Sequence, residues 1–197
     1  MIEVESSNGK LTAIADYLDE NDSEFFIDYI NSNIDKFKNY RATSNPNRFA
    51  LRFGRDQVFW DTTNHDLSLI GDIESKVREI FDNVCRKTEE IYNLDKKLYV
   101  ASFWMAKQFP GGFVMPHFDS LNNTNSHFEY SAIVYLNNLE SGGELMFPEL
   151  KYSYQPKGRD LVLFPSKGDD LIHQVAQING DRYSILFWLT YDEYFAV

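Results

Sequence analysis

Residues 115–119 (MPHFD) hold two side chains able to bind a metal ion, His117 and Asp119, with one residue between them. In a strand, residues i and i+2 project from the same face, so both side chains can point to one place. A third candidate ligand, His173, follows Asp119 after 54 residues, far enough for intervening strands to bring it beside the first two. The pattern predicts a site where two imidazoles and one carboxylate converge on a single ion.

Two histidines and one carboxylate on one face of a metal leave the opposite face open, which is typical of non-heme Fe(II) sites. His-x-Asp alone is a weak signal, and the later His173 and Arg182 strengthen it. Arg182 lies nine residues past His173. A guanidinium there can hold a carboxylate through two parallel hydrogen bonds.

The segments around these residues follow an order and spacing seen in a known family. They are residues 130–137 (YSAIVYLN), 142–147 (GGELMF), 158–165 (GRDLVLFP), 173–175 (HQV) and 180–188 (GDRYSILFW). With the candidate ligands, they resemble the Fe(II)- and 2-oxoglutarate-dependent dioxygenases, in the prolyl 4-hydroxylase-like branch. The resemblance covers residues 97–192 well and the first half only in outline.

This resemblance implies that His117, Asp119 and His173 bind Fe(II), with 2-oxoglutarate and O2 taking the open positions. The expected reaction hydroxylates a C–H bond and releases succinate and CO2, with ascorbate as an optional reductant. Related halogenases lack the carboxylate ligand, so Asp119 favours hydroxylation. Together with Arg182, these ligands form the expected catalytic set.

The resemblance also assigns residues to 2-oxoglutarate. Arg182 pairs with its distal carboxylate, Ser184 assists from the same strand face, and Tyr135 hydrogen-bonds the same group. Trp188 matches a tryptophan that lines the pocket, although plain core packing is an equal alternative. An arginine at position 182, where collagen-type enzymes carry lysine, is nearer to the hypoxia-type and bacterial enzymes.

One position departs from the family. Phe109 stands where a tyrosine often lies near the 1-carboxylate of 2-oxoglutarate, so the hydroxyl is missing. The Asn-rich stretch 119–125 is expected to be a surface loop beside the site. His127 at its edge either borders the entrance or is a bystander, and Arg55 and Trp60 are further candidates for substrate contact.

Composition limits the remaining possibilities. Hydrophobic residues make up 43% of the 197 residues and aromatic residues 16%, which indicates a folded chain long enough for one domain. The net charge of −11 argues against nucleic acid as partner and favours solubility, with a basic substrate as the alternative. No apolar run is long enough to cross a membrane, no signal peptide is evident, and a single cysteine, Cys85, suggests a reducing cytoplasm. The sequence does not indicate an oligomeric state.

Hydrophobic periodicity predicts helices first and strands afterwards. Helical spacing covers about 23–37 and 68–92, whereas 11–18 could form an edge strand and 48–60 two short strands or a hairpin. Strands are predicted from residue 97 onwards, at 98–109, 113–117, 128–136, 144–147, 160–164, 171–177 and 182–190. This order indicates an antiparallel jelly roll, with residues 1–95 as helical support for a core at 97–192. The resemblance names the fold as a cupin-like double-stranded β-helix.

The expected function is therefore hydroxylation of a C–H bond, with a prolyl residue of a peptide or protein as the substrate that the resemblance implies. Two alternatives stay open. One is the same chemistry on a free amino acid or small metabolite, and the other is a non-catalytic β-helix module that retains a metal.

Overall fold

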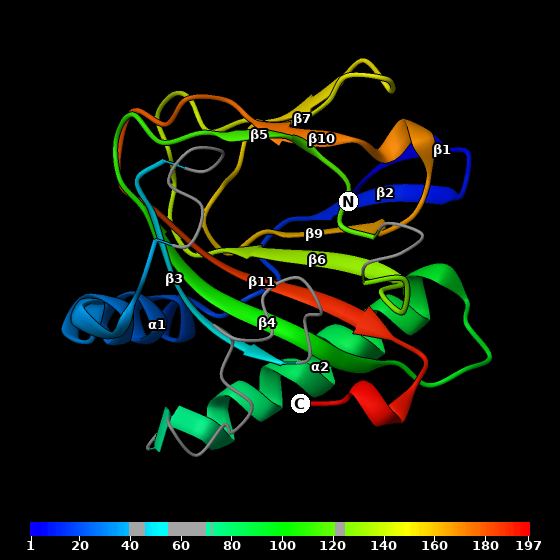
Figure 1. The fold of residues 1–197 in the computed structure, drawn as a ribbon, viewed down its shortest axis with the longest axis horizontal. Coiled ribbons are helices and arrows are strands. Elements are labelled where there is room, and N and C mark those ends of the chain that lie inside the picture. The colour runs from blue at the N-terminus through cyan, green and yellow to red at the C-terminus, as the bar shows by residue number, and fades with distance from the viewer. Residues whose placement is uncertain (40–45, 55–69, 72, 121–124) are drawn as a thin grey trace.

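Two antiparallel sheets face each other in the computed structural model (Figure 1), which describes residues 1–39, 46–54, 70–71, 73–120 and 125–197. The larger sheet contains, in spatial order, β1 (Ile2–Ser6), β2 (Gly9–Ile14), β9 (Leu161–Pro165), β6 (Tyr130–Tyr135), β11 (Arg182–Thr190), β4 (Tyr99–Gln108) and β3 (Arg48–Gly54). The smaller sheet contains β5 (Val114–His117), β10 (His173–Val175), β7 (Leu145–Phe147) and β8 (Tyr152–Tyr154). This arrangement confirms the predicted double-stranded β-helix.

Two helices cover the outer face of the larger sheet (Figure 1). Helix α1 (Glu20–Ser32) begins three residues before the predicted start because the Asp19 side chain accepts a hydrogen bond from the Asn21 N–H. It also ends earlier than predicted, and a short 3-10 helix follows at Ile34–Lys36. Helix α2 (Glu74–Tyr92) begins at residue 74 and not at the predicted 68, and it ends where predicted, before Asn93, which has the left-handed conformation with φ 50°.

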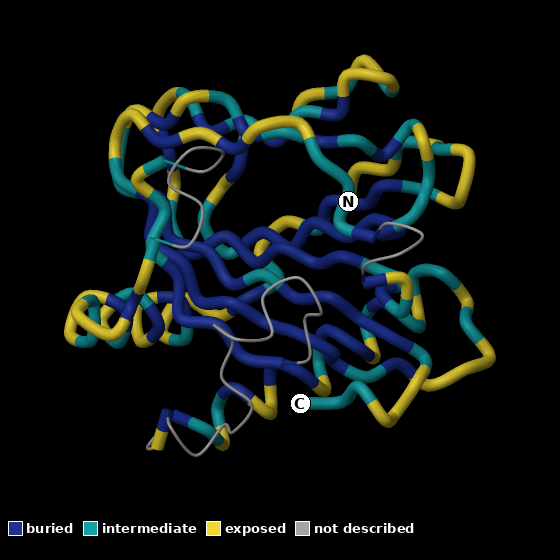
Figure 2. Tube along the Cα trace, viewed as in Figure 1, coloured by how far each residue is buried: buried dark blue, intermediate teal, exposed yellow. Residues whose placement is uncertain are grey.

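Strand β11, which lies between β6 and β4, separates two environments by strict alternation. Tyr183, Ile185, Phe187 and Leu189 belong to the core beneath the helices. The intervening residues at positions 182, 184, 186 and 188 therefore face the smaller sheet. The inner strands of the larger sheet, β9, β6, β11 and β4, are buried almost throughout, whereas exposed residues gather in β1, in the turns and on the outer sides of the helices (Figure 2).

A second core fills the space between the sheets. It is formed by Leu11, Val114, Ile133, Leu145, Phe147, Val162, Phe164, Val175 and their buried neighbours. These side chains come from both sheets, so the core holds β5 and β10 at a fixed distance above β6 and β11.

Several predictions of detail need correction. Strands β1 and β8, which lie at the outer ends of the two sheets, were not predicted from the sequence. Of the two strands or hairpin predicted at 48–60, the described part shows one strand, β3, and the candidates Arg55 and Trp60 lie outside the described residues. No helix in the described ranges is long and apolar enough for a membrane span.

The aromatic cluster under the helices yields a stability prediction. Phe103 is fully buried and its ring lies 4.9 Å from Phe81 and 5.1 Å from Phe53 between centroids. Phe103→Ala is expected to lower the free energy of unfolding by about 3–5 kcal/mol because it leaves a cavity. Phe25→Ala, at an exposed position of α1, is the control and should change it by less than about 1 kcal/mol in urea titrations. Equal effects of the two substitutions would contradict this core assignment.

Candidate functional site

A pair of adjacent strands brings the two histidines together. β5 and β10 run antiparallel, and His117 and His173 are direct partners across the pair. The next pair is Val114 with Val175, so β5 has one more residue between the pairs than β10. This irregularity is a β-bulge at residues 115–116, and it turns His117 to the same inner side as the buried Val114.

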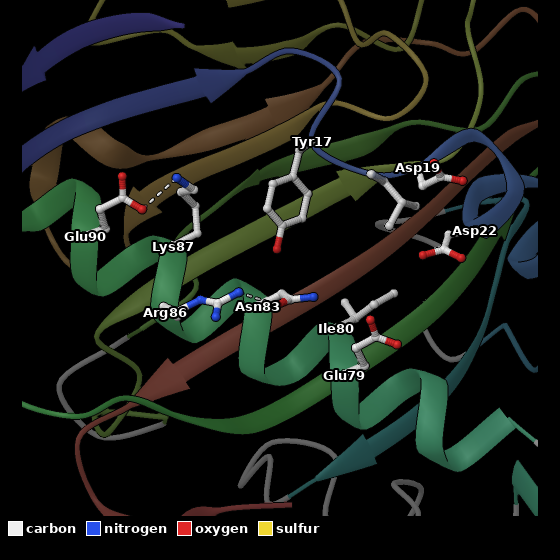
Figure 3. A pocket seen from close by; sticks show the side chains of 10 residues that line it. Tyr17, Asp19, Asp22, Glu79, Ile80, Asn83, Arg86, Lys87 and Glu90 are labelled. Atoms are coloured by element: carbon white, nitrogen blue, oxygen red, sulfur yellow. Dashed lines mark hydrogen bonds and ion pairs between the residues drawn. The ribbon is translucent and has the colours of Figure 1, made fainter.

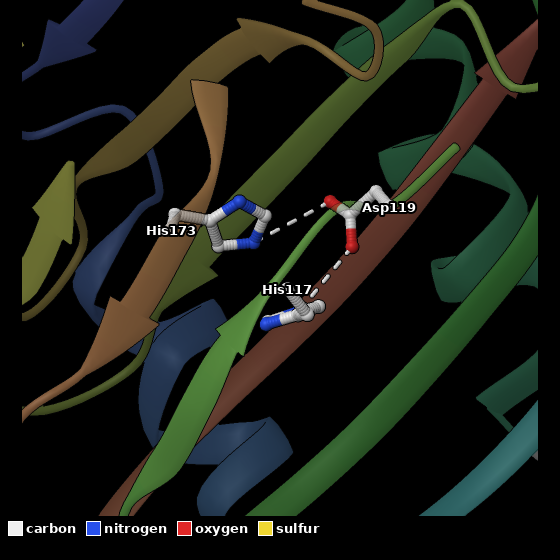
Figure 4. Close-up of side chains that lie close together, drawn as sticks. All are labelled: His117, Asp119 and His173. Atoms are coloured by element: carbon white, nitrogen blue, oxygen red, sulfur yellow. Dashed lines mark ion pairs between the residues drawn. The ribbon is translucent and has the colours of Figure 1, made fainter. Parts of the chain in front are cut away.

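Asp119 completes a triad with these histidines (Figure 4). Its Oδ1 lies 3.6 Å from Nε2 of His117 and its Oδ2 lies 3.7 Å from Nε2 of His173. One ligand atom from each of the three residues lies within 4.8 Å of the others. The distances are too long for direct hydrogen bonds and leave room for an ion between the three groups.

The backbone fixes which ring nitrogen faces the centre. Nδ1 of His117 lies 3.0 Å from the carbonyl oxygen of Met115, and Nδ1 of His173 lies 3.1 Å from that of Leu171. A carbonyl oxygen can only accept, so each neutral ring carries its proton on Nδ1 and its lone pair on Nε2. Both lone pairs therefore point towards Asp119, as metal binding requires.

Burial and charge keep His173 and Asp119 in the protonation states that bind a metal ion. Burial lowers the pKa of His173 to about 4, so its imidazole is neutral near pH 7. For Asp119, burial by itself would raise the pKa, but the attraction of the two histidines in their protonated forms and the hydrogen bond from the Ser131 hydroxyl outweigh it and hold the pKa below its usual value. The donor set of neutral imidazoles and an ionised carboxylate fits a divalent transition metal such as Fe(II).

A serine pair, not singled out in the sequence analysis, supports the carboxylate. Ser131 Oγ on β6 donates to Asp119 Oδ2 at 2.6 Å, and it also lies 2.7 Å from the Oγ of Ser166. Both serines are buried. Alternation along β6 puts Ser131 on the inner face with Ile133 and Tyr135, but only the tertiary structure shows that Asp119 lies opposite.

Arg182 begins β11 and lies inside the barrel, with 5% of its surface exposed. Its Nη1 donates to Gln108 Oε1 over a long 3.4 Å, its Nε has no hydrogen-bond partner, and no carboxylate within the described ranges forms an ion pair with it. The guanidinium lies 5.1 Å from the centre of the Tyr135 ring, and the fully buried Tyr135 hydroxyl also lacks a hydrogen-bond acceptor. Burial raises the pKa of Tyr135, so this hydroxyl stays protonated. A buried cation beside an unsatisfied hydroxyl fits a carboxylate supplied by a ligand.

Ser184 and Trp188 lie on the same face of β11 as Arg182. Ser184 is buried and pairs directly with Tyr135 across β6, next to Arg182. Trp188 lies near the other end of β11, where it pairs with Ser131. Its ring packs 4.6 Å from that of Trp104 and 5.8 Å from that of Phe128, between centroids. Ser184 therefore lies beside Arg182. Trp188 instead belongs to an aromatic cluster at the end of the barrel where Asp119 lies.

The expectation for Phe109 is wrong in its geometry. Phe109 packs edge-on to Phe49, 5.6 Å away, and lies 4.8 Å from Nζ of Lys107. Lys107 in turn contacts Tyr183 on the helix-covered side of the sheet. Phe109 therefore lies away from the triad because the alternation along β4 turns its neighbour Gln108 inward instead.

Two other candidates have settled positions. The His127 ring stacks on Phe195 at 3.9 Å between centroids, which favours the bystander interpretation. The predicted loop at 119–125 is described only at residues 119, 120 and 125.

A surface pocket outside the barrel lies between the start of α1 and α2 and is lined by Tyr17 and charged residues such as Asp22 and Glu79 (Figure 3). It is on the helical side of the larger sheet and shares no residue with the triad.

Comparisons with known proteins agree with this geometry. Residues 103–190 match the family model of the 2OG-Fe(II) oxygenase superfamily, a span that includes all three triad residues and Arg182. A search among curated proteins finds no match.

Solved structures of prolyl hydroxylases share the fold. A prolyl-4-hydroxylase of Pseudomonas putida superposes with a TM-score of 0.70 at 17% identity, covering 92% of each chain. The collagen prolyl hydroxylase of Paramecium bursaria Chlorella virus-1, in its complex with 2OG, gives 0.63 at 18% identity, covering 93% of this chain and 96% of the viral one. A Trichoplax adhaerens prolyl hydroxylase bound to a hypoxia inducible factor peptide fragment gives 0.62 at 19% identity, covering 94% and 84%. Residues 103–190 therefore match the 2OG-Fe(II) oxygenase superfamily and include the convergent triad, and the chain has the fold seen in solved prolyl hydroxylases.

Proposed function

We propose that this chain hydroxylates a prolyl residue of a peptide or protein, using Fe(II), 2-oxoglutarate and O2. The observation that carries the proposal is the enclosure of a His-Asp-His triad and a buried arginine between the same two sheets, where no described residue gives the arginine an acidic partner. When bound, iron and 2-oxoglutarate supply the oxidation, in which one oxygen atom of O2 enters the C–H bond and the other enters succinate as CO2 leaves.

The residues proposed to bind the metal and those proposed to bind 2-oxoglutarate lie at opposite ends of the inner face of β6. His117, Asp119 and His173 hold the metal at the end of β6 that carries Ser131. Arg182, with Tyr135 and Ser184, receives the distal carboxylate of 2-oxoglutarate at the other end. Ser131 and Tyr135 are four residues apart, or roughly 13 Å of strand. Trp188 lines the metal end with its neighbouring aromatic rings.

A peptide substrate is supported by the open side of the site. The His117 side chain is 31% exposed although His173 is almost fully buried. An extended chain can therefore approach the metal end from β5. Two structures of the same fold are a collagen prolyl hydroxylase and a prolyl hydroxylase in complex with a hypoxia inducible factor peptide fragment, which supports a polypeptide substrate.

The other candidates make different predictions. A free amino acid or small metabolite would use the same residues and would be turned over without a peptide. A non-catalytic module would have no use for a buried arginine that has no acidic partner among the residues that the structure describes. We also propose that residues 1–197 act as one domain in a reducing cytoplasm, where the buried Cys85 stays a thiol because burial raises its pKa to about 12.

Because the triad is proposed to bind iron and Arg182 to bind 2-oxoglutarate, substitutions at the two places should impair different binding steps. His117→Ala or Asp119→Ala should abolish iron binding and turnover, measured by metal content after anaerobic loading and by succinate formation. Arg182→Ala should keep its iron but weaken 2-oxoglutarate binding by about 2–5 kcal/mol, at least about thirtyfold, because a buried charge pair is lost. Equal loss of iron in all three variants would refute this division.

Substitution of Ser131 is expected to weaken metal binding without abolishing it. Its hydroxyl fixes the orientation of Asp119, and loss of such support typically weakens metal binding about 10–100-fold. Ser131→Ala is expected to show this loss in Co(II) titrations of the metal-free protein, and Ser131→Thr should restore most of the affinity. Ser102→Ala removes a buried hydroxyl that donates to the Phe53 carbonyl on β3, and it serves as the control. An unchanged Co(II) affinity in Ser131→Ala would remove Ser131 from the site.

The reaction itself is tested in two stages. Anaerobic addition of Fe(II) and then 2-oxoglutarate should produce the weak visible charge-transfer band of the chelate, and Arg182→Ala should lack it at the same concentration. Proline-containing peptides with O2 and ascorbate should then yield succinate and a mass gain of one oxygen atom on proline. Succinate formed only with free amino acids would select the small-molecule alternative, whereas iron binding without the band would favour the non-catalytic module.

A further inference from the structure

Gln108 is the residue that directly holds the guanidinium of Arg182. It ends β4, is 2% exposed, and pairs in register with Arg182 on β11 and with Arg48 on β3. Its Oε1 accepts from Arg182 Nη1 at 3.4 Å, and its Nε2 donates to the carbonyl oxygen of Phe113 at 3.1 Å. Both ends of the carboxamide are therefore engaged.

The turn after β4 is built closely around this side chain. A Cβ atom at Gly112 would lie 2.7 Å from Cγ of Gln108 and 2.9 Å from its Nε2, so only glycine fits there without displacement. The Phe113 carbonyl belongs to the residue before β5, the strand that carries His117. Gln108 thus links the arginine to the strand of a metal ligand and has little freedom to leave Arg182.

Gln108 carries no charge, and this affects how strongly Arg182 can bind the carboxylate of a ligand. A carboxylate at the same place would pair with Arg182 and satisfy the buried cation within the protein. The carboxamide oxygen orients the guanidinium through one long hydrogen bond and leaves its positive charge and its other donors available.

We infer that Gln108 is a positioning residue for the co-substrate: it aims Arg182 at the distal carboxylate of a dicarboxylate without neutralising it. The inference rests on the proposed function, because it takes Arg182 as the 2-oxoglutarate anchor. It also replaces Phe109 with Gln108 as the residue of this segment that faces the site.

Two probes separate anchoring from chelation. Glutarate has both carboxylates of 2-oxoglutarate but lacks the keto oxygen, so its binding to metal-free protein, followed by thermal shift and calorimetry, reports on the Arg182 end. Anaerobic Fe(II) protein titrated with 2-oxoglutarate reports on the complete site.

Gln108→Glu should weaken binding of both probes by at least about tenfold, because an internal carboxylate competes for Arg182. Two flanking arginines should stabilise that glutamate, so the variant is expected to fold. Gln108→Leu keeps a similar volume without charge and should weaken binding by about threefold through lost orientation. It keeps the test decisive if the glutamate variant is unfolded, since unchanged affinity in Gln108→Leu would also overturn the inference.

A matched control and a double variant complete the design. Gln155 likewise donates to a backbone carbonyl, that of Gly142, so Gln155→Glu repeats the change of charge and the loss of a donor without touching Arg182. It should bind both probes like the wild type. Gln108→Glu in the Arg182→Ala background should cause no further loss.

Several outcomes overturn the inference. Gln108→Glu could bind as tightly as the wild type, its penalty could persist in full without Arg182, or Gln155→Glu could lose as much. Each would mean that Gln108 does not act through the arginine. If the wild type binds neither glutarate nor 2-oxoglutarate, the proposed function fails and this inference with it.

Discussion

The alternation of side chains along β11 is the constraint on which the rest of the structure depends. The strand lies between β6 and β4, and its apolar set packs under the helices. A shift of one residue in register would exchange the two faces of the strand, moving Arg182 into that apolar core and Tyr183 into the barrel. The hydrophobic core therefore does more than stabilise the sheet: it fixes the position of the buried cation.

Electrostatics gives the two ends of the barrel opposite characters. At the metal end, a carboxylate lies between two imidazoles whose lone pairs are aimed at it by backbone hydrogen bonds. At the other end, a guanidinium and a tyrosine hydroxyl are buried without an acidic partner in the described ranges. One end therefore suits a cation and the other a carboxylate, and this polarity would orient a 2-oxoglutarate molecule before any chemistry begins. Burial strengthens both preferences because water does not screen the charges.

Support from neighbouring side chains recurs around each functional group. Ser131 and Ser166 lie behind Asp119, Phe147 and Phe164 pack against His173, and Gln108 holds Arg182. Each contact restrains a group that would otherwise rotate, and a site with fixed groups loses less entropy when its ligands bind. The bulge in β5 has the same effect on the backbone, since it aims His117 inward while Met115 stays exposed.

Much of the fold and of the site can be predicted from the order of residues in the chain. Periods of two and 3.6 residues placed most of the strands and both helices, and β11 has the bounds that its apolar alternation predicted. The His-x-Asp pair with His173 and Arg182 predicted the groups that meet in the site, because chemistry of this kind needs particular residue types in a particular order. Strand ends were less certain, and the outlying β1 and β8 were missed, since edge strands carry a weak hydrophobic pattern.

Only the tertiary structure decided the contacts between distant segments. Ser131 and Ser166 are ordinary strand serines until the fold puts Asp119 opposite them. Phe109 seemed to be a residue of the site, yet the pairing of β4 with β11 turns Gln108 inward and Phe109 out. Such assignments depend on register and on bulges, which are set by packing across the whole sheet and leave no local signal in the chain.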